Sequence, residues 1–225
     1  MKPTVKICGF MRAEDVQMCI TYGVDIVGFV ADYPLPVPWN LNIEETANLI
    51  KGVNGKAKTC VVTGIPPNGA SVSSSDADKI LRIALITKPD YIQLHCEESL
   101  DEVFYIANEL HKHGIKIIKT IYPHMPDLIH SANAYHAAGA YALLLDSRGP
   151  GNAASGGAAD LDAFVGLLYA VACPLFLAGG ITPDNVACII ARSQAGYIDI
   201  MSGVETSPGI KDETKVAALF QALNS

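Results

Sequence analysis

Two residues capable of acid–base chemistry stand where apolar runs end. Cys8 follows Val5-Lys6-Ile7, and Asp146 closes the run 141–146. Only about 3% of an ordinary thiol is thiolate at neutral pH, and a neighbouring Lys6 ammonium would raise that fraction. A thiolate that removes a proton and an acid that delivers one could together interconvert an aldose and a ketose. Each residue also has a purely structural explanation, because free cysteine is often buried and a carboxylate can cap a loop.

Small residues follow two later apolar runs. Gly179-Gly180 comes directly after 176–178, and Ser202-Gly203 follows 197–201. Glycines let backbone N–H groups approach an anion, and a helix N-terminus adds a favourable dipole. Loops after the seventh and eighth strands of parallel barrels commonly bind phosphate. We therefore predict a phosphate-ester site at these four residues, although tight turns alone would also require glycine.

Three further polar residues accompany these motifs. Side chains alternate along a strand, so Lys6 shares the inward face with Cys8 and needs a partner for its buried charge. His95 ends the run 91–95 and could contact ligand or be a satisfied polar group at the rim. Asp199 could hydrogen-bond substrate or neutralise Lys6. The candidate partners for the lysine are Asp25, Asp146 and Asp199.

Apolar runs alternate with helical patterns along the whole chain. We expect strands at 4–8, 25–30, 58–63, 90–94, 116–121, 141–146, 174–178 and 197–201. We expect helices at 13–22, 43–52, 74–87, 98–113, 127–138, 161–171, 183–192 and 212–223. Eight such units predict a single α/β domain over residues 1–225, a closed (β/α)8 barrel rather than a doubly wound open sheet. The first and sixth strands would then hold Cys8 and Asp146 on facing sides of the mouth.

Local signals support these elements. Ser99-Leu100-Asp101-Glu102 and Thr182-Pro183-Asp184-Asn185 are typical helix starts, the second with proline at the first helical position. Two long loops, 31–42 and 147–160, follow strands on the face where barrels place active sites. Three glycines are expected to cap helix C-termini: Gly23, Gly114 and Gly139.

Composition limits the function classes. The chain carries a net charge of −7 with no basic cluster, which argues against nucleic-acid binding. Its six cysteines show no C-x-x-C spacing and indicate reduced thiols of a cytoplasmic protein. We find no signal-peptide core in residues 1–20 and no run of membrane-spanning length. His111 and His113 stand two apart on a predicted helix, so no metal site is expected there or elsewhere. A monomer and a homodimer are both compatible with the sequence.

Several of these motifs, taken together and in order, carry a family resemblance. They are Lys6-Ile7-Cys8-Gly9, Asp25-Ile26-Val27-Gly28-Phe29-Val30, Gln93-Leu94-His95, Leu144-Leu145-Asp146, Ala178-Gly179-Gly180-Ile181-Thr182-Pro183-Asp184-Asn185-Val186, Ser202-Gly203-Val204-Glu205 and Ser207-Pro208-Gly209-Ile210-Lys211-Asp212. Over nearly its whole length the chain resembles the phosphoribosylanthranilate isomerases, TIM-barrel enzymes of tryptophan biosynthesis.

The resemblance implies a mechanism for the Amadori rearrangement of N-(5-phosphoribosyl)anthranilate, a small phosphosugar. Asp146 would open the ribose ring as general acid, and the Cys8 thiolate would take the proton from the sugar C2. Phosphate would rest near Gly180 and Gly203, Asp199 would lie beside the substrate, and His95 matches a histidine at the rim. No metal or organic cofactor is implied, because the substrate's own imine is the electron sink.

Two departures from the family pattern concern the loops. The family usually carries an arginine after the second strand, where it meets the anthranilate carboxylate, but Tyr33 to Asn40 contains no cation. Trp39 could stack on the aryl ring, and Arg148 could replace the missing cation. After the sixth strand, the residues 153–157 keep only the Ser-Gly core of the family's glycine-rich run, so Gly156 joins the predicted phosphate set.

Two other hypotheses therefore remain at this point. One is a paralogous barrel isomerase that takes another phosphorylated aminosugar. The other is a non-catalytic barrel that binds a phosphosugar, although such a binder needs neither Cys8 nor Asp146.

Overall fold

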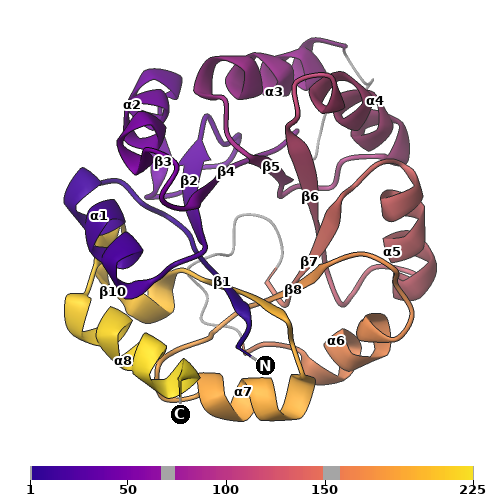
Figure 1. Ribbon diagram of the computed structural model, residues 1–225. Coiled ribbons are helices and arrows are strands. Elements are labelled where there is room, and N and C mark those ends of the chain that lie inside the picture. The colour runs from indigo at the N-terminus through magenta and orange to yellow at the C-terminus, as the bar shows by residue number, and fades with distance from the viewer. Residues whose placement is uncertain (1, 67–73, 149–157, 225) are drawn as a thin grey trace.

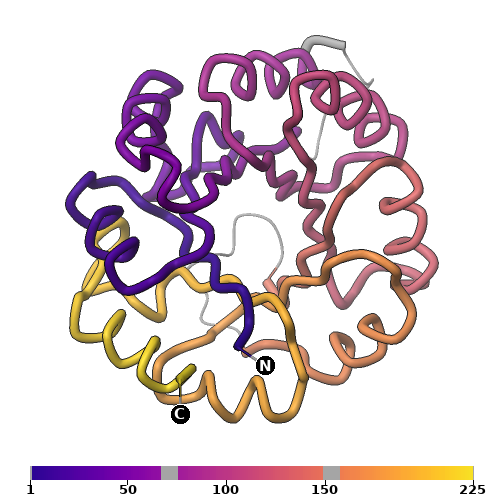
Figure 2. The backbone as a smooth tube through the Cα atoms, viewed as in Figure 1, coloured from indigo at the N-terminus to yellow at the C-terminus, as the bar shows by residue number. Residues whose placement is uncertain are grey.

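Eight parallel strands close into a barrel in the computed structural model, which describes residues 2–66, 74–148 and 158–224. Neighbouring strands follow the order β1-β9-β8-β7-β6-β5-β4-β2, and pairing of β1 with β2 completes the ring (Figures 1 and 2). The predicted (β/α)8 barrel is confirmed, and the open sheet is excluded. The barrel strands are β1 Thr4–Ile7, β2 Ile26–Ala31, β4 Lys58–Thr63, β5 Tyr91–Leu94, β6 Lys116–Ile121, β7 Ala142–Asp146, β8 Leu175–Ala178 and β9 Tyr197–Ile200.

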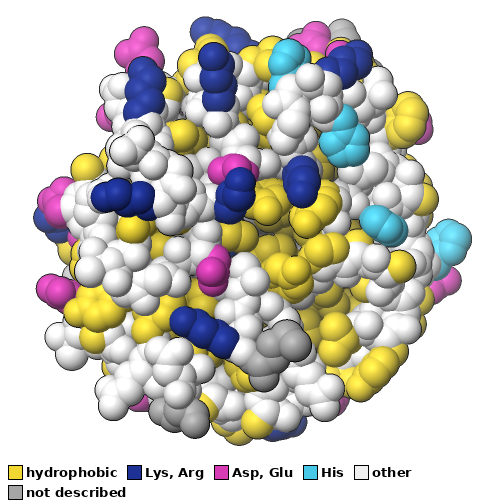
Figure 3. All heavy atoms as spheres, viewed as in Figure 1, with side chains coloured by type: hydrophobic (Ala, Val, Ile, Leu, Met, Phe, Trp, Pro, Cys, Tyr) yellow, Lys and Arg dark blue, Asp and Glu magenta, His cyan; other side chains and the backbone are white. Residues whose placement is uncertain are grey.

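Eight helices form the outer ring, one after each barrel strand (Figure 1). They are α1 Ala13–Tyr22, α2 Ile43–Val53, α3 Ser74–Thr87, α4 Leu100–His111, α5 Leu128–Ala137, α6 Leu161–Leu168, α7 Val186–Ser193 and α8 Glu213–Leu223. No helix in the described part of the chain is long and apolar enough to cross a bilayer. On the face shown in Figure 3, basic and acidic side chains are interspersed around a centre where apolar atoms are visible.

Helix ends follow the predicted signals in some places and not in others. Ser99 caps α4 through a capping box with Glu102, and Gly23 ends α1 with a positive φ of 93°. The predicted start of α7 is wrong, because that helix begins only at Val186. The Asn185 side chain accepts a hydrogen bond from the Thr182 backbone N–H at 2.8 Å. The Thr182 carbonyl also accepts the Val186 N–H at 3.0 Å, so Pro183 lies in a turn directly ahead of the regular helix.

The apolar core has two layers, as expected for strands whose side chains alternate between the barrel interior and the helices. The larger layer lies between the strands and the helix ring. The inner layer fills the barrel and consists of Ile26, Cys60, Ile118, Ala142, Leu144, Phe176 and Ala178. The interior is therefore packed, and the polar side chains that line the pocket lie at the carboxyl ends of the strands.

Short elements complete the mouth of the barrel. β3, Asn40–Leu41, adds to the edge of β2 within the loop that follows it. Between β9 and α8, a 3-10 turn η1, Ser202–Val204, leads into an antiparallel hairpin of β10, Glu205–Ser207, and β11, Ile210–Lys211. This hairpin brings two buried charged residues, Glu205 and Lys211, to the mouth.

Candidate active site

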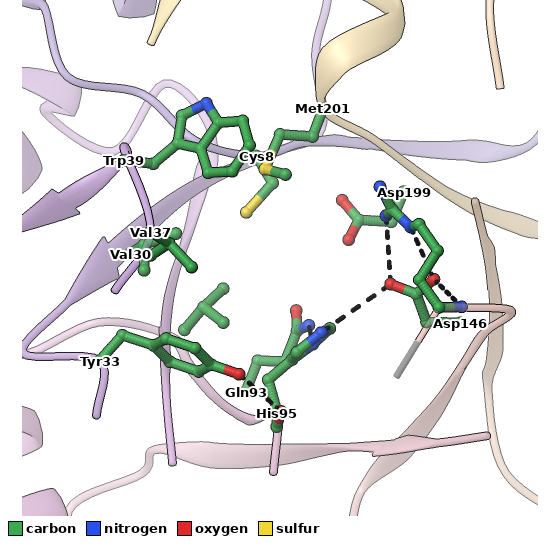
Figure 4. A pocket seen from close by; sticks show the side chains of 12 residues that line it. Cys8, Val30, Tyr33, Val37, Trp39, Gln93, His95, Asp146, Asp199 and Met201 are labelled. Carbon is green, nitrogen blue, oxygen red and sulfur yellow. Dashed lines mark hydrogen bonds and ion pairs between the residues drawn. The ribbon is translucent and has the colours of Figure 1, made fainter. Parts of the chain in front are cut away.

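A pocket of about 570 Å³, open to solvent, lies at the carboxyl ends of the strands (Figure 4). Five of the predicted catalytic and polar substrate-binding residues line it, Cys8, His95, Asp146, Arg148 and Asp199, as does Trp39, the predicted stacking partner of the aryl ring. The remaining lining residues are Val30, Tyr33, Val37, Trp39, Val62, Gln93 and Met201. Cys8 and Asp146 enter the pocket from different sides, because two strands, β9 and β8, separate β1 from β7.

The Cys8 thiol sits directly beyond β1. Its backbone N–H donates to the Ile200 carbonyl at 2.9 Å, which continues the pairing with β9 past the strand end. A Cβ built on Gly28 would approach Cys8 Sγ to 2.9 Å, so glycine leaves room for the thiol. Burial raises the pKa of Cys8, and the Lys6 ammonium opposes this shift without cancelling it. Lys6 therefore lowers the pKa of Cys8 as expected, but burial has the larger effect and favours the thiol over the thiolate.

Lys6 and Asp199 form an ion pair beneath the pocket. The two residues are register partners on β1 and β9, and Lys6 Nζ lies 2.9 Å from each Asp199 carboxylate oxygen. Of the three candidate partners for the lysine, the structure therefore selects Asp199. Asp25 instead accepts the Val5 backbone N–H at 2.8 Å. Burial acts to lower the Lys6 pKa, but the Asp199 carboxylate outweighs it and the pKa is raised.

Asp146 is held by Arg148, two residues farther along the chain. Asp146 Oδ1 accepts hydrogen bonds from the Arg148 backbone N–H and Nε, both at 3.0 Å. Asp146 Oδ2 accepts from Nη2 at 3.1 Å, which makes the ion pair bidentate. His95 Nε2 lies 3.8 Å from Oδ2 on the other side. The predicted acid and the predicted substrate cation are therefore partners of one another in this structure.

The imidazole of His95 is held through its Nδ1 atom. Gln93 Nε2 and Thr120 Oγ1 each lie 3.0 Å from it. The backbone carbonyl of His95 accepts hydrogen bonds from the hydroxyls of Tyr33 at 2.9 Å and Tyr122 at 3.0 Å. These four contacts fix the ring at the rim, with Nε2 directed toward Asp146 (Figure 4).

Burial lowers the pKa of His95 to about 4, although the Asp146 carboxylate acts in the opposite direction. The imidazole is therefore neutral at physiological pH. Nearby, the buried Oε1 of Gln93 has no hydrogen-bond partner among the described residues. A ligand donor in the pocket could supply that missing partner.

An apolar wall faces Asp146 across the pocket (Figure 4), formed by Val30, Tyr33, Val37 and Trp39. Trp39 is 2% exposed, and its Nε1 donates to Glu205 Oε1 at 3.0 Å. Lys211 Nζ lies 2.6 Å from the same oxygen and donates to the Cys8 carbonyl at 2.5 Å. Glu205 and Lys211 belong to a family motif in the sequence, and no role was predicted for either of them. The Pro208-Gly209 turn between them was the available signal that they lie on facing strands.

The predicted phosphate loops after β8 and β9 lie against each other. A Cβ at Gly203 would clash with the Ile181 carbonyl oxygen, so only glycine permits this approach. Gly179 and Gly180 both have positive φ, at 104° and 60°. The Ser147 hydroxyl is buried without a partner among the described residues and lies where a Cβ on Gly179 would be. Gly156, the remaining member of the predicted set, falls outside the described residues.

No group of three or more His, Cys, Asp or Glu side chains suited to a metal ion occurs within residues 2–66, 74–148 and 158–224. The pocket instead combines a thiol, a carboxylate, a neutral imidazole and a guanidinium around an apolar wall. Such an arrangement can move protons on a substrate that is partly apolar and partly anionic.

Comparison with known proteins gives a consistent result. A family model described as N-(5'phosphoribosyl)anthranilate (PRA) isomerase matches residues 5–222. The N-(5'-phosphoribosyl)anthranilate isomerase of Acinetobacter calcoaceticus is 31% identical over 224 residues, which cover 99% of this chain and 97% of that protein. The protein of the same description from Rhodopseudomonas palustris is 32% identical over 225 residues, 99% of this chain and 96% of that one.

Solved structures agree with the sequence relatives. The phosphoribosyl anthranilate isomerase of Thermus thermophilus superposes with a TM-score of 0.79 at 28% identity and covers 98% of each chain. The enzyme of the same description from Thermotoga maritima gives a TM-score of 0.80 at 25% identity, covering 99% of this chain and 98% of that chain.

Proposed function

The chain belongs to the N-(5'-phosphoribosyl)anthranilate isomerase family, and we propose that its pocket isomerises N-(5'-phosphoribosyl)anthranilate by general acid–base catalysis. The observation that carries the proposal is the entry of a thiol, Cys8, and a carboxylate, Asp146, into one pocket from different sides. The names of the relatives favour this substrate over other phosphorylated aminosugars. The reaction is a step of tryptophan biosynthesis.

Asp146 acts first, as the acid. Its proton passes to the ring oxygen of the ribose, the C1–O bond breaks, and the nitrogen lone pair forms a protonated imine at C1. The 2% exposure of Asp146 keeps bulk water from competing for this proton transfer. The neutral imidazole of His95 has its Nε2 atom 3.8 Å from Asp146 Oδ2, so it adds no positive charge beside the acid.

Cys8 acts second, as the base. Its thiolate takes the C2 proton, the C–H electrons become a C1–C2 double bond, and the imine electrons return to nitrogen. The enolamine then tautomerises to the 1-amino-ketose. Burial raises the pKa of the free Cys8 thiol, so its deprotonation depends on nearby positive charge. Both the Lys6 ammonium and the protonated imine of the substrate supply this positive charge.

The two ends of the substrate have different environments. The phosphate binds the loops at Gly179, Gly180, Ser202 and Gly203, where the Ser147 hydroxyl, which has no partner among the described residues, is an additional donor. The aryl ring packs on the wall that includes Trp39, and Arg148 is the cation for its carboxylate. No cofactor takes part, because the imine accepts the electrons.

The direct test uses N-(5-phosphoribosyl)anthranilate made in situ from anthranilate and ribose 5-phosphate. Its fluorescence should disappear in proportion to added enzyme, and the product should be 1-(2-carboxyphenylamino)-1-deoxyribulose 5-phosphate by mass and chromatography. A folded protein that leaves the fluorescence unchanged would overturn the proposal.

A further inference from the structure

Arg148 is hydrogen-bonded to Asp146, the residue whose carboxyl group must carry the catalytic proton. It makes three hydrogen bonds to the two Asp146 oxygens, at 3.0, 3.0 and 3.1 Å. Hydrogen bonds of a guanidinium to a carboxyl group are charge-assisted and are stronger when the acid is ionised. An acid that opens the ribose ring must instead be protonated. The resting arrangement therefore opposes the acid step as long as the guanidinium stays in place.

The anion that could attract Arg148 away is part of the substrate. Among the described residues, Arg148 is the one lysine or arginine that lines the pocket. The three buried lysines around the mouth are each committed to a carboxylate: Lys6 to Asp199, Lys119 to Glu98 and Lys211 to Glu205. An aryl carboxylate in this pocket would therefore meet Arg148 as its cationic partner and compete with Asp146 for it.

We propose that Arg148 exchanges partners during the reaction, binding Asp146 in the free enzyme and the aryl carboxylate in the complex. The exchange frees the Asp146 carboxylate to take up a proton from solvent, which reaches the open pocket, and to pass it to the ring oxygen, so the substrate's own carboxylate switches on the acid. This inference rests on the proposed function and adds to it a basis for substrate specificity. Only an N-aryl phosphoribosylamine with an ortho anion would be turned over at full rate.

The surroundings of Asp146 are suited to this exchange. Arg148 lies past the end of β7, so moving its side chain breaks no strand pairing. The groups that face Asp146 are Arg148, the neutral His95 and, across the pocket floor, the Lys6–Asp199 pair. When the guanidinium leaves, the neutral His95 remains beside the carboxylate, with Nε2 3.8 Å from Asp146 Oδ2. Asp146 then keeps its place but loses its counter-ion.

The experiment compares two substrates and two enzymes. N-(5-phosphoribosyl)anthranilate and N-(5-phosphoribosyl)aniline, made in situ from aniline and ribose 5-phosphate, differ only in the carboxylate. With the wild-type enzyme, loss of the carboxylate should lower kcat itself by about 10–150-fold, the value of a charge-assisted contact. In Arg148→Gln, kcat should fall on the anthranilate substrate, whose carboxylate loses its partner, but exceed the wild-type kcat on the aniline substrate, because no guanidinium restrains Asp146.

Opposite changes in kcat on the two substrates would distinguish the exchange of partners by Arg148 from a purely structural role of that residue. If Arg148 only orders the loop, Arg148→Gln lowers kcat on both substrates by the same factor, and the proposal is overturned. It is equally overturned if the carboxylate changes only KM. Arg192→Gln, at an exposed position on α7, is the matched control and should behave as wild type. Failure of the proposed function looks different, since the wild-type enzyme would then not turn over the anthranilate substrate at all.

Discussion

The ammonium of Lys6 lies 2.9 Å from both carboxylate oxygens of Asp199, directly below the thiol of Cys8. The lysine is fully buried, and neighbouring strands hold the two residues in register. A buried pair of this kind contributes little net stability, but removal of one partner leaves an uncompensated charge.

Lys6→Met is therefore expected to lower the free energy of unfolding by about 3–5 kcal/mol, because Asp199 loses its counter-ion. Lys58→Met is the matched control, since Lys58 pairs with Asp90 at 2.7 Å with 63% of its side chain exposed. Lys58→Met should lower the free energy of unfolding by only about 0–1 kcal/mol. Denaturant unfolding of both variants tests the difference, and equal costs would contradict the assignment of Lys6 as a buried charge.

Gly28→Ala should impair turnover by displacing the base. The new Cβ would lie 2.9 Å from Cys8 Sγ, so the thiol must move, at an overpacking cost of about 1–3 kcal/mol. Gly52→Ala provides the control, because a Cβ on Gly52 in α2 meets nothing within 4 Å. It should raise stability by about 0.5–1 kcal/mol and leave kcat unchanged. A Gly28→Ala enzyme with wild-type kcat would show that the thiol position is not critical.

His95 should make stability depend on acid pH. Its pKa is lowered to about 4 in the folded protein, against about 6.5 when unfolded. The contribution of His95 to the free energy of unfolding is fully present above pH 6.5 and is lost as the pH falls through 4. The free energy of unfolding changes by at most about 3 kcal/mol over this range. Urea unfolding at pH 7, 6, 5 and 4 should show a shallower decline for His95→Gln than for wild type. His130→Gln, at an exposed position, should retain the wild-type slope, and identical slopes for all three proteins would contradict the prediction.

Glu205→Gln should disturb both the aryl wall and the base. Glu205 accepts from Trp39 Nε1, and its partner Lys211 also donates to the Cys8 carbonyl. Loss of the carboxylate leaves Lys211 unpaired, so we expect about 3 kcal/mol lower stability and kcat lower by on the order of tenfold. Trp39 is the only tryptophan in the chain, so its fluorescence reports the change. Glu109→Gln, which affects an exposed pair with Lys112, should leave emission and kcat unchanged.

The barrel was predictable because its local signals agree. Each strand is a short apolar run followed by a helical pattern, and the observed strand bounds differ from the predicted ones by one residue or none. The helix bounds differ by up to three residues, as at the end of α6 and the start of α7. The start of α7 was predicted three residues early, because residues 182–186 form a turn, closed by the Val186 N–H on the Thr182 carbonyl at 3.0 Å, before the regular helix begins. The Thr182-Pro183-Asp184-Asn185 signal therefore marked the turn that leads into the helix.

The site was predictable as a set of residues but not as a set of contacts. Residue type and strand position indicated Cys8, His95 and Asp146, and all three line one pocket. The bidentate hold of Arg148 on Asp146 depends on backbone geometry past a strand end, which no sequence pattern encodes. The contact between Trp39 and Glu205 joins residues 166 positions apart, so only the closed barrel brings them together.

The most direct test of the central claim is the kcat/KM of Cys8→Ala and Asp146→Asn on N-(5-phosphoribosyl)anthranilate, with circular dichroism to verify folding. If the thiol is the base and the carboxylate the acid, each variant should lose about 10²–10⁴-fold in kcat/KM while remaining folded. A folded Cys8→Ala or Asp146→Asn enzyme that works at the wild-type rate would contradict the account.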